Sequence, residues 1–281
     1  MIHIKSLLII LLTCLAPALK AEERPFYFIQ MSDPQFGMYA AIEKGSGFAK
    51  ETANMEKAIA AINKLSPAFI VITGDLVENL TDKQQLAEYQ RLKEKIRKDI
   101  PVYQLPGNHD LGNEAKEENV KLYLERYGYD CFSFTIYNCC FIGINTQVLY
   151  GDNRPREWQQ RIWLQHILEN AKQCNHRIVF GHYPLFEKDF EEPDKYQNIP
   201  IAMRSLYLDI FDRYGVSHMF SGHLHYPSEG TYKNFHAVGT GAVGFPIGEN
   251  TKSGLRIVKV YPDHIESEFV ELDKIPTDIK L

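Results

Sequence analysis

Five short runs of strand-forming residues in this chain each lead directly into residues that can bind a metal ion. One run, for example, extends from Phe69 to Thr73 and is followed at once by Gly74-Asp75. The five polar blocks are, in chain order, Asp33-Pro34-Gln35, Gly74-Asp75, Gly107-Asn108-His109-Asp110, Gly181-His182 and Gly222-His223-Leu224-His225. Oxygen and imidazole ligands gathered where strands end predict a centre for two metal ions at one edge of a β-sheet.

Segments with helical spacing of apolar residues lie between these runs. Their apolar side chains recur every three or four positions, which is typical of amphipathic helices. These positions are Met55, Ile59 and Ile62; Leu86, Tyr89 and Leu92; Trp163, Leu164, Ile167 and Leu168; and Leu206, Ile210, Phe211 and Tyr214. Alternating strands and helices favour parallel strands joined by right-handed crossovers, because parallel neighbours need a long connection.

The middle and the C-terminal part of the chain depart from this alternation. Residues 131–137 and 140–144 read as a hairpin whose turn is Asn138-Cys139. Three further strands are expected at 235–238, 255–261 and 265–270. We therefore expect a second, mainly antiparallel sheet stacked on the first. Because no repeat or low-complexity linker divides the chain, we expect a single domain over residues 22–281.

The first 21 residues have the pattern of a secretory signal peptide. Lys5 precedes an apolar run from Leu7 to Leu12, and Ala18 or Ala21 offers a small residue for cleavage. The run is shorter than the ~20 residues that span a bilayer. We therefore expect an exported protein, periplasmic or secreted. The alternative is a membrane-anchored lipoprotein, because Leu11-Leu12-Thr13-Cys14 resembles a lipidation box that would acylate Cys14.

Charge excludes one class of partner. The formal net charge is −5, and no block of basic residues stands out along the chain. A mildly acidic chain of this kind is not expected to bind a nucleic-acid scaffold. Contact with a membrane is expected only if Cys14 is lipidated.

The five blocks, in this order, resemble those of the calcineurin-like metallophosphoesterases. The resemblance runs from Asp33 to His225 and implies a four-layer α/β/β/α sandwich of two mixed sheets flanked by helices. It also implies two divalent metal ions, which lie about 3.5–4 Å apart in such centres and need a bridging carboxylate. The roles implied are Asp75 as the bridge, Asp33, Gln35 and His225 for the first ion, Asn108, His182 and His223 for the second, His109 as general acid, and Asp110 as the residue that orients the His109 ring.

Gln35 departs from the usual pattern, because most members of this family have histidine there. An amide oxygen suits magnesium, manganese or iron better than zinc, so the identity of the ions stays open among Mn, Fe, Mg and Zn. Asp33-Pro34-Gln35-Phe36-Gly37 is similar to the opening block of one branch of the family, the calcineurin-like phosphoesterase domain-containing protein 1 group of serine/threonine phosphatases. This favours the hydrolysis of phosphomonoesters.

The expected activity is therefore that of a phosphatase acting on a phosphorylated small molecule or a phosphoprotein. A phosphodiesterase acting on nucleotide or lipid-linked diesters is the alternative, and an inactive secreted binding protein is another. The presence of Asp75, Asn108 and His109 argues against an inactive protein. Residues close behind the ligand blocks are candidates for substrate contact, namely Phe36, Tyr39, Glu78 and Asn79. Histidines outside the blocks are interpreted as packed or exposed residues, namely His166, His176, His218, His236 and His264.

Overall fold

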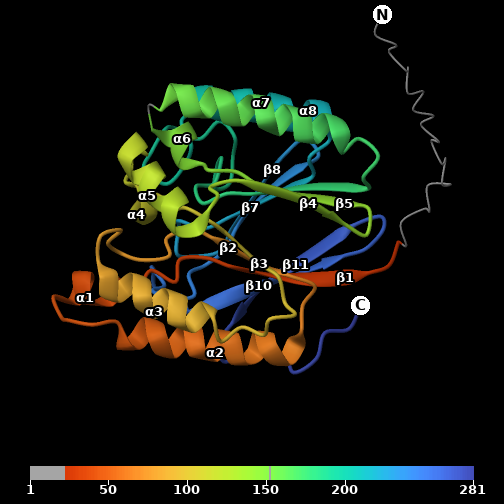
Figure 1. Ribbon diagram of the computed structural model, residues 1–281. Coiled ribbons are helices and arrows are strands. Elements are labelled where there is room, and N and C mark those ends of the chain that lie inside the picture. Colours follow the sequence, from red (N-terminus) through yellow and green to blue (C-terminus); the bar gives the residue numbers. More distant parts are fainter. Residues whose placement is uncertain (1–22, 152) are drawn as a thin grey trace, which may run out of the picture.

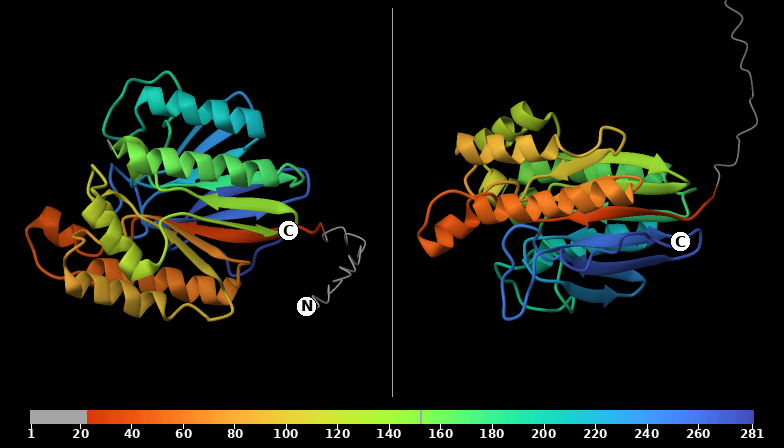
Figure 2. Two further views of the ribbon diagram at one scale, coloured as in Figure 1. Left: turned by 45° about the horizontal axis from the view of Figure 1, so that its top comes forward. Right: turned by 90° about the horizontal axis from the view of Figure 1, so that it is seen from below.

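Two β-sheets stack face to face, and helices cover the outer face of each (Figure 1). The computed structural model describes residues 23–151 and 153–281, so the predicted signal peptide lies outside the described residues. Helices α2 (Ala49–Leu65) and α3 (Lys83–Lys93) cover the first sheet, and α7 (Arg154–Asn170) and α8 (Ile201–Tyr214) cover the second. The helical layers also lie on opposite sides in the left view of Figure 2. The predicted four-layer fold is confirmed.

The first sheet is mixed and has five strands in the order β11-β10-β1-β2-β3. Its strands are β1 (Phe26–Met31), β2 (Ile70–Thr73), β3 (Val102–Leu105), β10 (Gly254–Val260) and β11 (Ile265–Glu271). The pairs β1–β2 and β2–β3 are parallel, whereas β10 pairs antiparallel with both β1 and β11. The carboxyl ends of β1, β2 and β3 therefore meet at one edge of the sheet.

The second sheet is also mixed and has six strands in the order β4-β5-β6-β7-β9-β8. Its strands are β4 (Phe132–Ile136), β5 (Cys139–Gly143), β6 (His176–Phe180), β7 (His218–Ser221), β8 (Ser228–Tyr232) and β9 (Phe235–Gly239). The central pairs β5–β6, β6–β7 and β7–β9 are parallel, and only the pairs at the two edges are antiparallel. Strands β6 and β7 supply the remaining ligand blocks.

This arrangement corrects the expectation of a mainly antiparallel second sheet. The strands predicted at 255–261 and 265–270 join the first sheet, where Val258 pairs with Phe28. Strand β10 is buried on both faces, since Val258 faces the core between the sheets and Leu255 packs towards the helices. A strand apolar on both faces needs a neighbour on each side and cover above and below, which only an interior position provides.

The hairpin turn lies one residue earlier than predicted. Tyr137 and Asn138 form it with positive φ angles of 47° and 61°, so Cys139 already begins β5. Two central residues with positive φ match the twist of the flanking strands, which is why such turns join hairpins.

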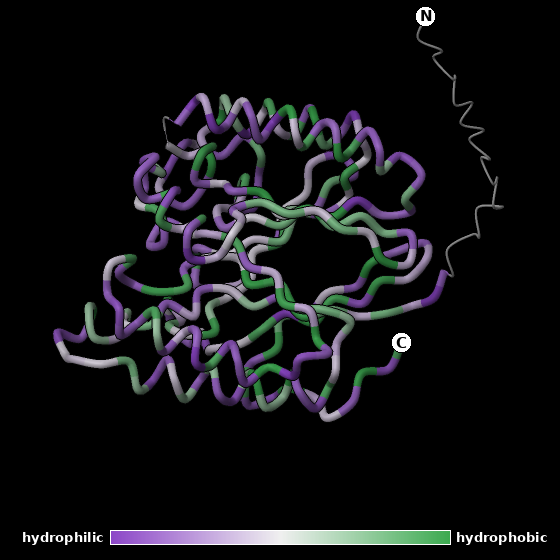
Figure 3. The backbone as a smooth tube through the Cα atoms, in the orientation of Figure 1, coloured by the Kyte–Doolittle hydropathy of each residue, from purple (hydrophilic) through white to green (hydrophobic). Residues whose placement is uncertain are grey.

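Aromatic rings fill the space between the sheets. The Phe28 ring stacks on Phe69 with centroids 4.7 Å apart, and it meets the edges of Phe141 and Phe180 at 5.6 Å. Figure 3 shows hydrophobic residues along the facing strands and an alternation of hydrophobic and hydrophilic residues along the outer helices. Burial of such rings is the main force that holds the two sheets together.

The outer helices follow the predicted amphipathic pattern. In α2, for example, Met55, Ile59 and Ile62 are buried against the first sheet. Asp82 caps α3 by accepting hydrogen bonds from the backbone nitrogens of Gln84 and Gln85. The shorter helices are α1 (Met38–Glu43), α4 (Asn108–Leu111), α5 (Glu117–Tyr127) and α6 (Gln147–Tyr150). Within the described residues, no helix is both long and apolar enough to span a bilayer.

Candidate metal centre

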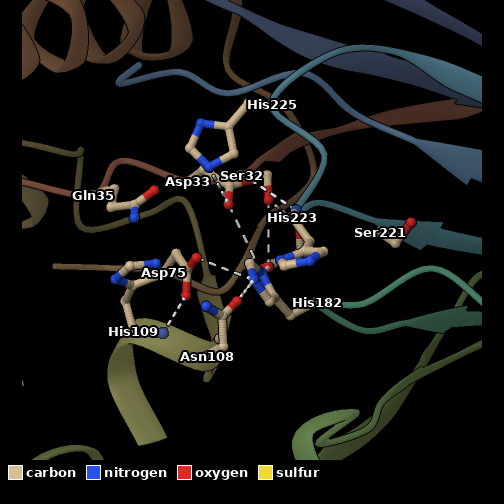
Figure 4. A network of polar contacts seen from close by, with 12 residues as sticks. Ser32, Asp33, Gln35, Asp75, Asn108, His109, His182, Ser221, His223 and His225 are labelled. Carbon is tan, nitrogen blue, oxygen red and sulfur yellow. Dashed lines mark hydrogen bonds and ion pairs between the residues drawn. The ribbon is translucent and has the colours of Figure 1, made fainter. Parts of the chain in front are cut away.

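The five polar blocks meet at one end of the sandwich, where strands of both sheets stop (Figure 4). Asp33 and Asp75 come just after β1 and β2, and Asn108 begins α4 just after β3. His182 follows β6, and His223 follows β7. The carboxyl ends of the parallel strands of both sheets lie at this same end, so residues 190 positions apart meet, as in the bond that the His223 backbone nitrogen donates to Asp33 Oδ2 at 3.1 Å.

Five of the seven expected ligands form two overlapping groups. One group is Asp75, His182 and His223, and the other is Asp33, Asp75 and His225. Within each group the ligand atoms lie within 4.8 Å of one another, and all five residues are buried. Asp75 belongs to both groups, which is the geometry that a carboxylate bridging two ions requires.

The remaining two expected ligands, Gln35 and Asn108, lie beside these groups (Figure 4). Asn108 Oδ1 is 3.0 Å from His182 Nε2. Gln35 Nε2 donates a hydrogen bond to Glu78 Oε2 at 2.7 Å. The amide oxygen of Gln35 is therefore the atom available to bind a metal ion. The structure thus brings all seven residues together, and their binding of metal stays a prediction.

Two buried oxygens fit a cation at this position. Among the described residues, Asp33 Oδ1 and Gln35 Oε1 have no hydrogen-bond partner although both atoms are buried. A buried acceptor without a partner costs about 1–3 kcal/mol, and more if it is charged. Carboxylate, amide oxygen and imidazole are together the donor set of a divalent metal ion, so the residues present fit such an ion.

A backbone oxygen bonds to one ring nitrogen of each of the three expected histidine ligands. His182 Nδ1 lies 2.8 Å from the oxygen of Thr73, and His223 Nε2 lies 3.1 Å from the oxygen of Tyr196. His225 Nδ1 is bonded to the oxygen of Phe245. Such bonds orient each ring, and once the ring is neutral they leave its other nitrogen as the acceptor that a metal ion needs.

Backbone strain also concentrates in these blocks. Five expected ligands have positive φ angles: Asp33 at 53°, Gln35 at 36°, Asp75 at 49°, His223 at 70° and His225 at 62°. Each such residue costs on the order of 1–3 kcal/mol, and strain of this kind clusters at functional sites. Gly107 is required for a related reason, since a Cβ there would collide with the Asp75 carboxylate.

Electrostatics make the centre a site for positive charge. Burial alone would raise the pKa of the Asp75 carboxyl, but His182 and His109 hold it below its usual range. Burial would likewise lower the pKa of His182, yet Asp75 and Asp33 raise it to about 9. A proton on His182 therefore balances the carboxylates when no metal is bound. Metal binding has to displace this proton, so metal affinity falls as the pH falls.

The His109 ring is oriented by Glu78. Its Nδ1 is 3.1 Å from both the backbone oxygen and the Oε2 of Glu78. The orienting role predicted for Asp110 does not fit this geometry, because the Asp110 carboxylate accepts from the backbone nitrogens of Gly107 at 2.9 Å and Leu76 at 3.1 Å. Asp110 instead fixes the backbone of two ligand blocks. Glu78 bonds to both Gln35 and His109, a role that sequence reasoning missed.

A cavity of about 570 Å³ opens beside His109. Glu78 and Asn79 line it together with Asn108 and His109, and their contact with a substrate stays a prediction. Phe36 was predicted to line the pocket and does not, because its side chain is fully buried against Phe48 and Tyr89. Phe36 was a candidate because it follows a strand, but its ring is part of the apolar core beneath α2 and α3.

Two aromatic side chains flank the centre outside this cavity wall. Tyr39, another predicted substrate contact, packs edge-on against Phe245 with centroids 4.5 Å apart. Tyr196 was not predicted. Its hydroxyl accepts from Asn108 Nδ2 at 3.0 Å, and its backbone oxygen bonds to His223, so one loop residue positions two expected ligands. Tyr196 lies in the segment between β6 and α8, outside any motif, and no sequence signal marks it.

The chain belongs to the calcineurin-like phosphoesterase family, whose sequence profile matches residues 26–227. With the donor set described above, this makes it a metal-dependent phosphoesterase. It is similar to the serine/threonine-protein phosphatase CPPED1 of Rattus norvegicus, with 38% identity over 267 residues that cover 89% of this chain and 85% of the rat protein. The human CPPED1 is 34% identical over 278 residues, covering 92% of this chain and 88% of the human protein. The predicted resemblance is confirmed.

The fold is shared with more distant solved structures. A dimetal phosphatase from Danio rerio superposes with a TM-score of 0.66 at 12% identity, covering 88% of this chain and 97% of that one. At this level of identity the likeness concerns the fold alone.

Substituting the amide at the first block tests how the centre selects its metal. In Gln35→His, an imidazole replaces a neutral oxygen donor, so the ratio of activity with Zn²⁺ to activity with Mn²⁺ is expected to rise about tenfold or more. Activity is measured on metal-depleted protein with each metal added in turn. Gln84→His, an exposed position on α3, is the matched control. An unchanged metal preference in Gln35→His would show that Gln35 does not bind the ion.

Proposed function

We propose that this chain hydrolyses phosphomonoesters with two divalent ions and that its natural substrates are phosphorylated serine or threonine side chains of proteins. The observation that carries the proposal is Asp75, which is shared by two groups of buried ligand atoms. The relatives are serine/threonine-protein phosphatases, which supports the same substrate class for this chain. Because Gln35 contributes an amide oxygen, we propose Mn, Fe or Mg rather than Zn for the first position.

The division of labour follows from the contacts. Asp33, Gln35 and His225 would hold one ion, Asn108, His182 and His223 the other, and Asp75 both. Divalent ions bound at these positions would offset the negative charge of the phosphoryl oxygens and lower the pKa of a bound water.

His109 donates the proton to the leaving group, and Glu78 positions its ring. With Nδ1 of His109 held by Glu78, Nε2 is the nitrogen available to the leaving oxygen. Burial alone would lower the pKa of His109, but Asp75 and Glu78 raise it above its usual value, which favours the protonated ring that a general acid needs.

A comparison of monoester and diester substrates tests the proposal. We expect kcat/KM for 4-nitrophenyl phosphate and a phosphoserine peptide to exceed that for bis(4-nitrophenyl) phosphate by about tenfold or more, a difference of about 1.4 kcal/mol in the barrier. Each is assayed with Mn²⁺, Mg²⁺, Fe²⁺ and Zn²⁺, and protein with Asp75→Asn, purified in parallel, measures contaminating phosphatases. The reverse order would identify a phosphodiesterase, and no turnover under any metal would identify a binding protein.

We further propose that residues 22–281 form a single exported domain, periplasmic or secreted. The support is the sequence of the first 21 residues, with Lys5, the apolar run to Leu12 and the small residues Ala18 and Ala21. The mass of the chain recovered from its native host tests this. A mature N-terminus near Glu22 is expected, whereas an acylated Cys14 would identify the lipoprotein instead.

A further inference from the structure

A second group of histidines lies at the opposite end of the sandwich from the strand-end centre. His218 is the first residue of β7, whereas His223 follows the last residue of that strand. His176 is the first residue of β6, and His236 lies in β9. His264 follows in the turn between β10 and β11, so both sheets contribute to the group.

Strand register places three of these imidazoles on one face. His218 pairs with His236, and Ile178 pairs with His218, so these side chains and that of His176 point to the same side of the second sheet. Ile178 belongs to the apolar core between the sheets. The face that is apolar along most of these strands therefore ends in histidines. Packing alone does not require such a change.

This second group of histidines, His176, His218, His236 and His264, lines a cavity of about 410 Å³. All four histidines contribute to its wall, and Glu229 and Ser267 contribute to it as well. The His218 and His236 rings are stacked with centroids 4.7 Å apart and planes within 16° of each other. His236 and His264 are exposed, so an ion from solvent has direct access.

In three of these histidines one ring nitrogen lies beside an oxygen. His176 Nε2 is 2.8 Å from the oxygen of Tyr261, and His218 Nδ1 is 3.0 Å from Ser217 Oγ. His264 Nδ1 is 2.8 Å from Asp263 Oδ1. The second nitrogen of the His176 and His218 rings has no hydrogen bond to a described residue, so it is available to an ion.

The protonation state of His218 is also compatible with metal binding. Burial, together with the neighbouring rings of His236 and His176, lowers the pKa of His218 to about 3. The ring is therefore neutral at physiological pH, and the neutral imidazole is the form that binds metals.

We propose that His218 and His236 are the chelating pair of a second metal site, which takes a borderline transition-metal dication such as Ni²⁺, Cu²⁺ or Zn²⁺. Imidazole donors suit these ions rather than magnesium or calcium. The site needs a side-chain adjustment, since among the described residues the groups with three ligand atoms within 4.8 Å belong to the strand-end centre. Turning the two stacked rings about χ2, a broad torsion, would direct one nitrogen of each towards a shared ion and would replace the contact of His218 with Ser217. His176, His264 and Glu229 line the same cavity and offer further donors.

Titration of Ni²⁺ into tag-free protein tests the site. The proteins compared are the parent, the double variant His218→Gln/His236→Gln, and His166→Gln, which removes an exposed histidine on α7. We expect the parent and His166→Gln to bind about one more Ni²⁺ per chain than the double variant, as measured by calorimetry. All three proteins are expected to hydrolyse 4-nitrophenyl phosphate with Mn²⁺ at the same rate.

Equal Ni²⁺ stoichiometry in the three proteins would overturn the proposal. The single variant His236→Gln guards against misfolding, since that side chain is exposed, and it too is expected to lose the additional ion. Retention of that ion in a folded His236→Gln protein would equally overturn the site. The Ni²⁺ difference is independent of catalysis, so it stands or falls separately from the phosphatase function.

Discussion

Replacing the Asp75 carboxylate with an amide, in Asp75→Asn, is expected to lower kcat/KM for phosphomonoesters by about 10³-fold or more. Asp75 is the residue common to both groups of buried ligand atoms, so its loss weakens both positions at once. Its Oδ2 lies 3.2 Å from His182 Nε2, and its Oδ1 accepts from the backbone nitrogen of His109 at 2.8 Å. An amide keeps the size of the side chain but supplies a single neutral oxygen donor.

Steady-state kinetics and metal content by elemental analysis measure this effect together. Asp99→Asn makes the same chemical change at an exposed carboxylate that pairs with Arg97, and it is expected to leave both quantities unchanged. Thermal unfolding of the metal-depleted proteins checks that Asp75→Asn is folded. If folded Asp75→Asn retained more than about a tenth of the parent activity, a bridging role for Asp75 would be excluded.

The position of the expected ligands could be predicted because it follows from local rules. Strand runs such as Phe69–Thr73 are visible as short apolar segments, and their carboxyl ends meet at one edge when the strands are parallel. Asp33 and Asp75 could therefore be placed together without any knowledge of the tertiary structure. The same rule places His182 and His223 together at the ends of β6 and β7.

The hydrogen-bond partners of the expected ligands and of His109 could not be predicted, because they depend on side-chain geometry between distant segments. Asp110 is adjacent to His109 in sequence, yet its carboxylate points to backbone nitrogens while Glu78, 31 residues away, holds the ring. Tyr196 meets Asn108 across 88 residues through a loop that has no periodic pattern. Adjacency in sequence is a poor guide to the direction of a side chain at a sharp turn.

The sequence pattern likewise could not predict which sheet the C-terminal strands join. Strand β10 has the same apolar character whichever sheet it joins, and a pattern of period two does not name a partner strand. The pairing of Val258 with Phe28, 230 positions apart, is decided by the aromatic core that both strands help to enclose. Strand β8 escaped prediction for a simpler reason, since its residues Ser228–Tyr232 are mostly polar and lie at a sheet edge.

Removal of the imidazole in His109→Ala is expected to slow hydrolysis of phosphoserine by about 10²–10⁴-fold, the range that general acid catalysis contributes. Hydrolysis of 4-nitrophenyl phosphate is expected to change much less, because nitrophenolate leaves without a proton. The effect is measured as kcat/KM for the two substrates under the same metal conditions. Glu78 raises the pKa of His109, so its replacement in Glu78→Gln is expected to lower that pKa. The decline of phosphoserine hydrolysis at high pH is then expected to begin at a lower pH.

The ratio of the two rates, rather than either rate alone, identifies the role of His109. His109 lies next to Asn108, and its backbone nitrogen donates to Asp75, so a substitution that merely disturbed the metal ligands would slow both substrates alike. Equal loss on phosphoserine and 4-nitrophenyl phosphate would therefore refute the general acid. His166→Ala, on the outer face of α7, controls for loss of a histidine elsewhere. A selective loss confined to phosphoserine, with unchanged metal content, would separate proton transfer by His109 from the role of the seven expected ligands.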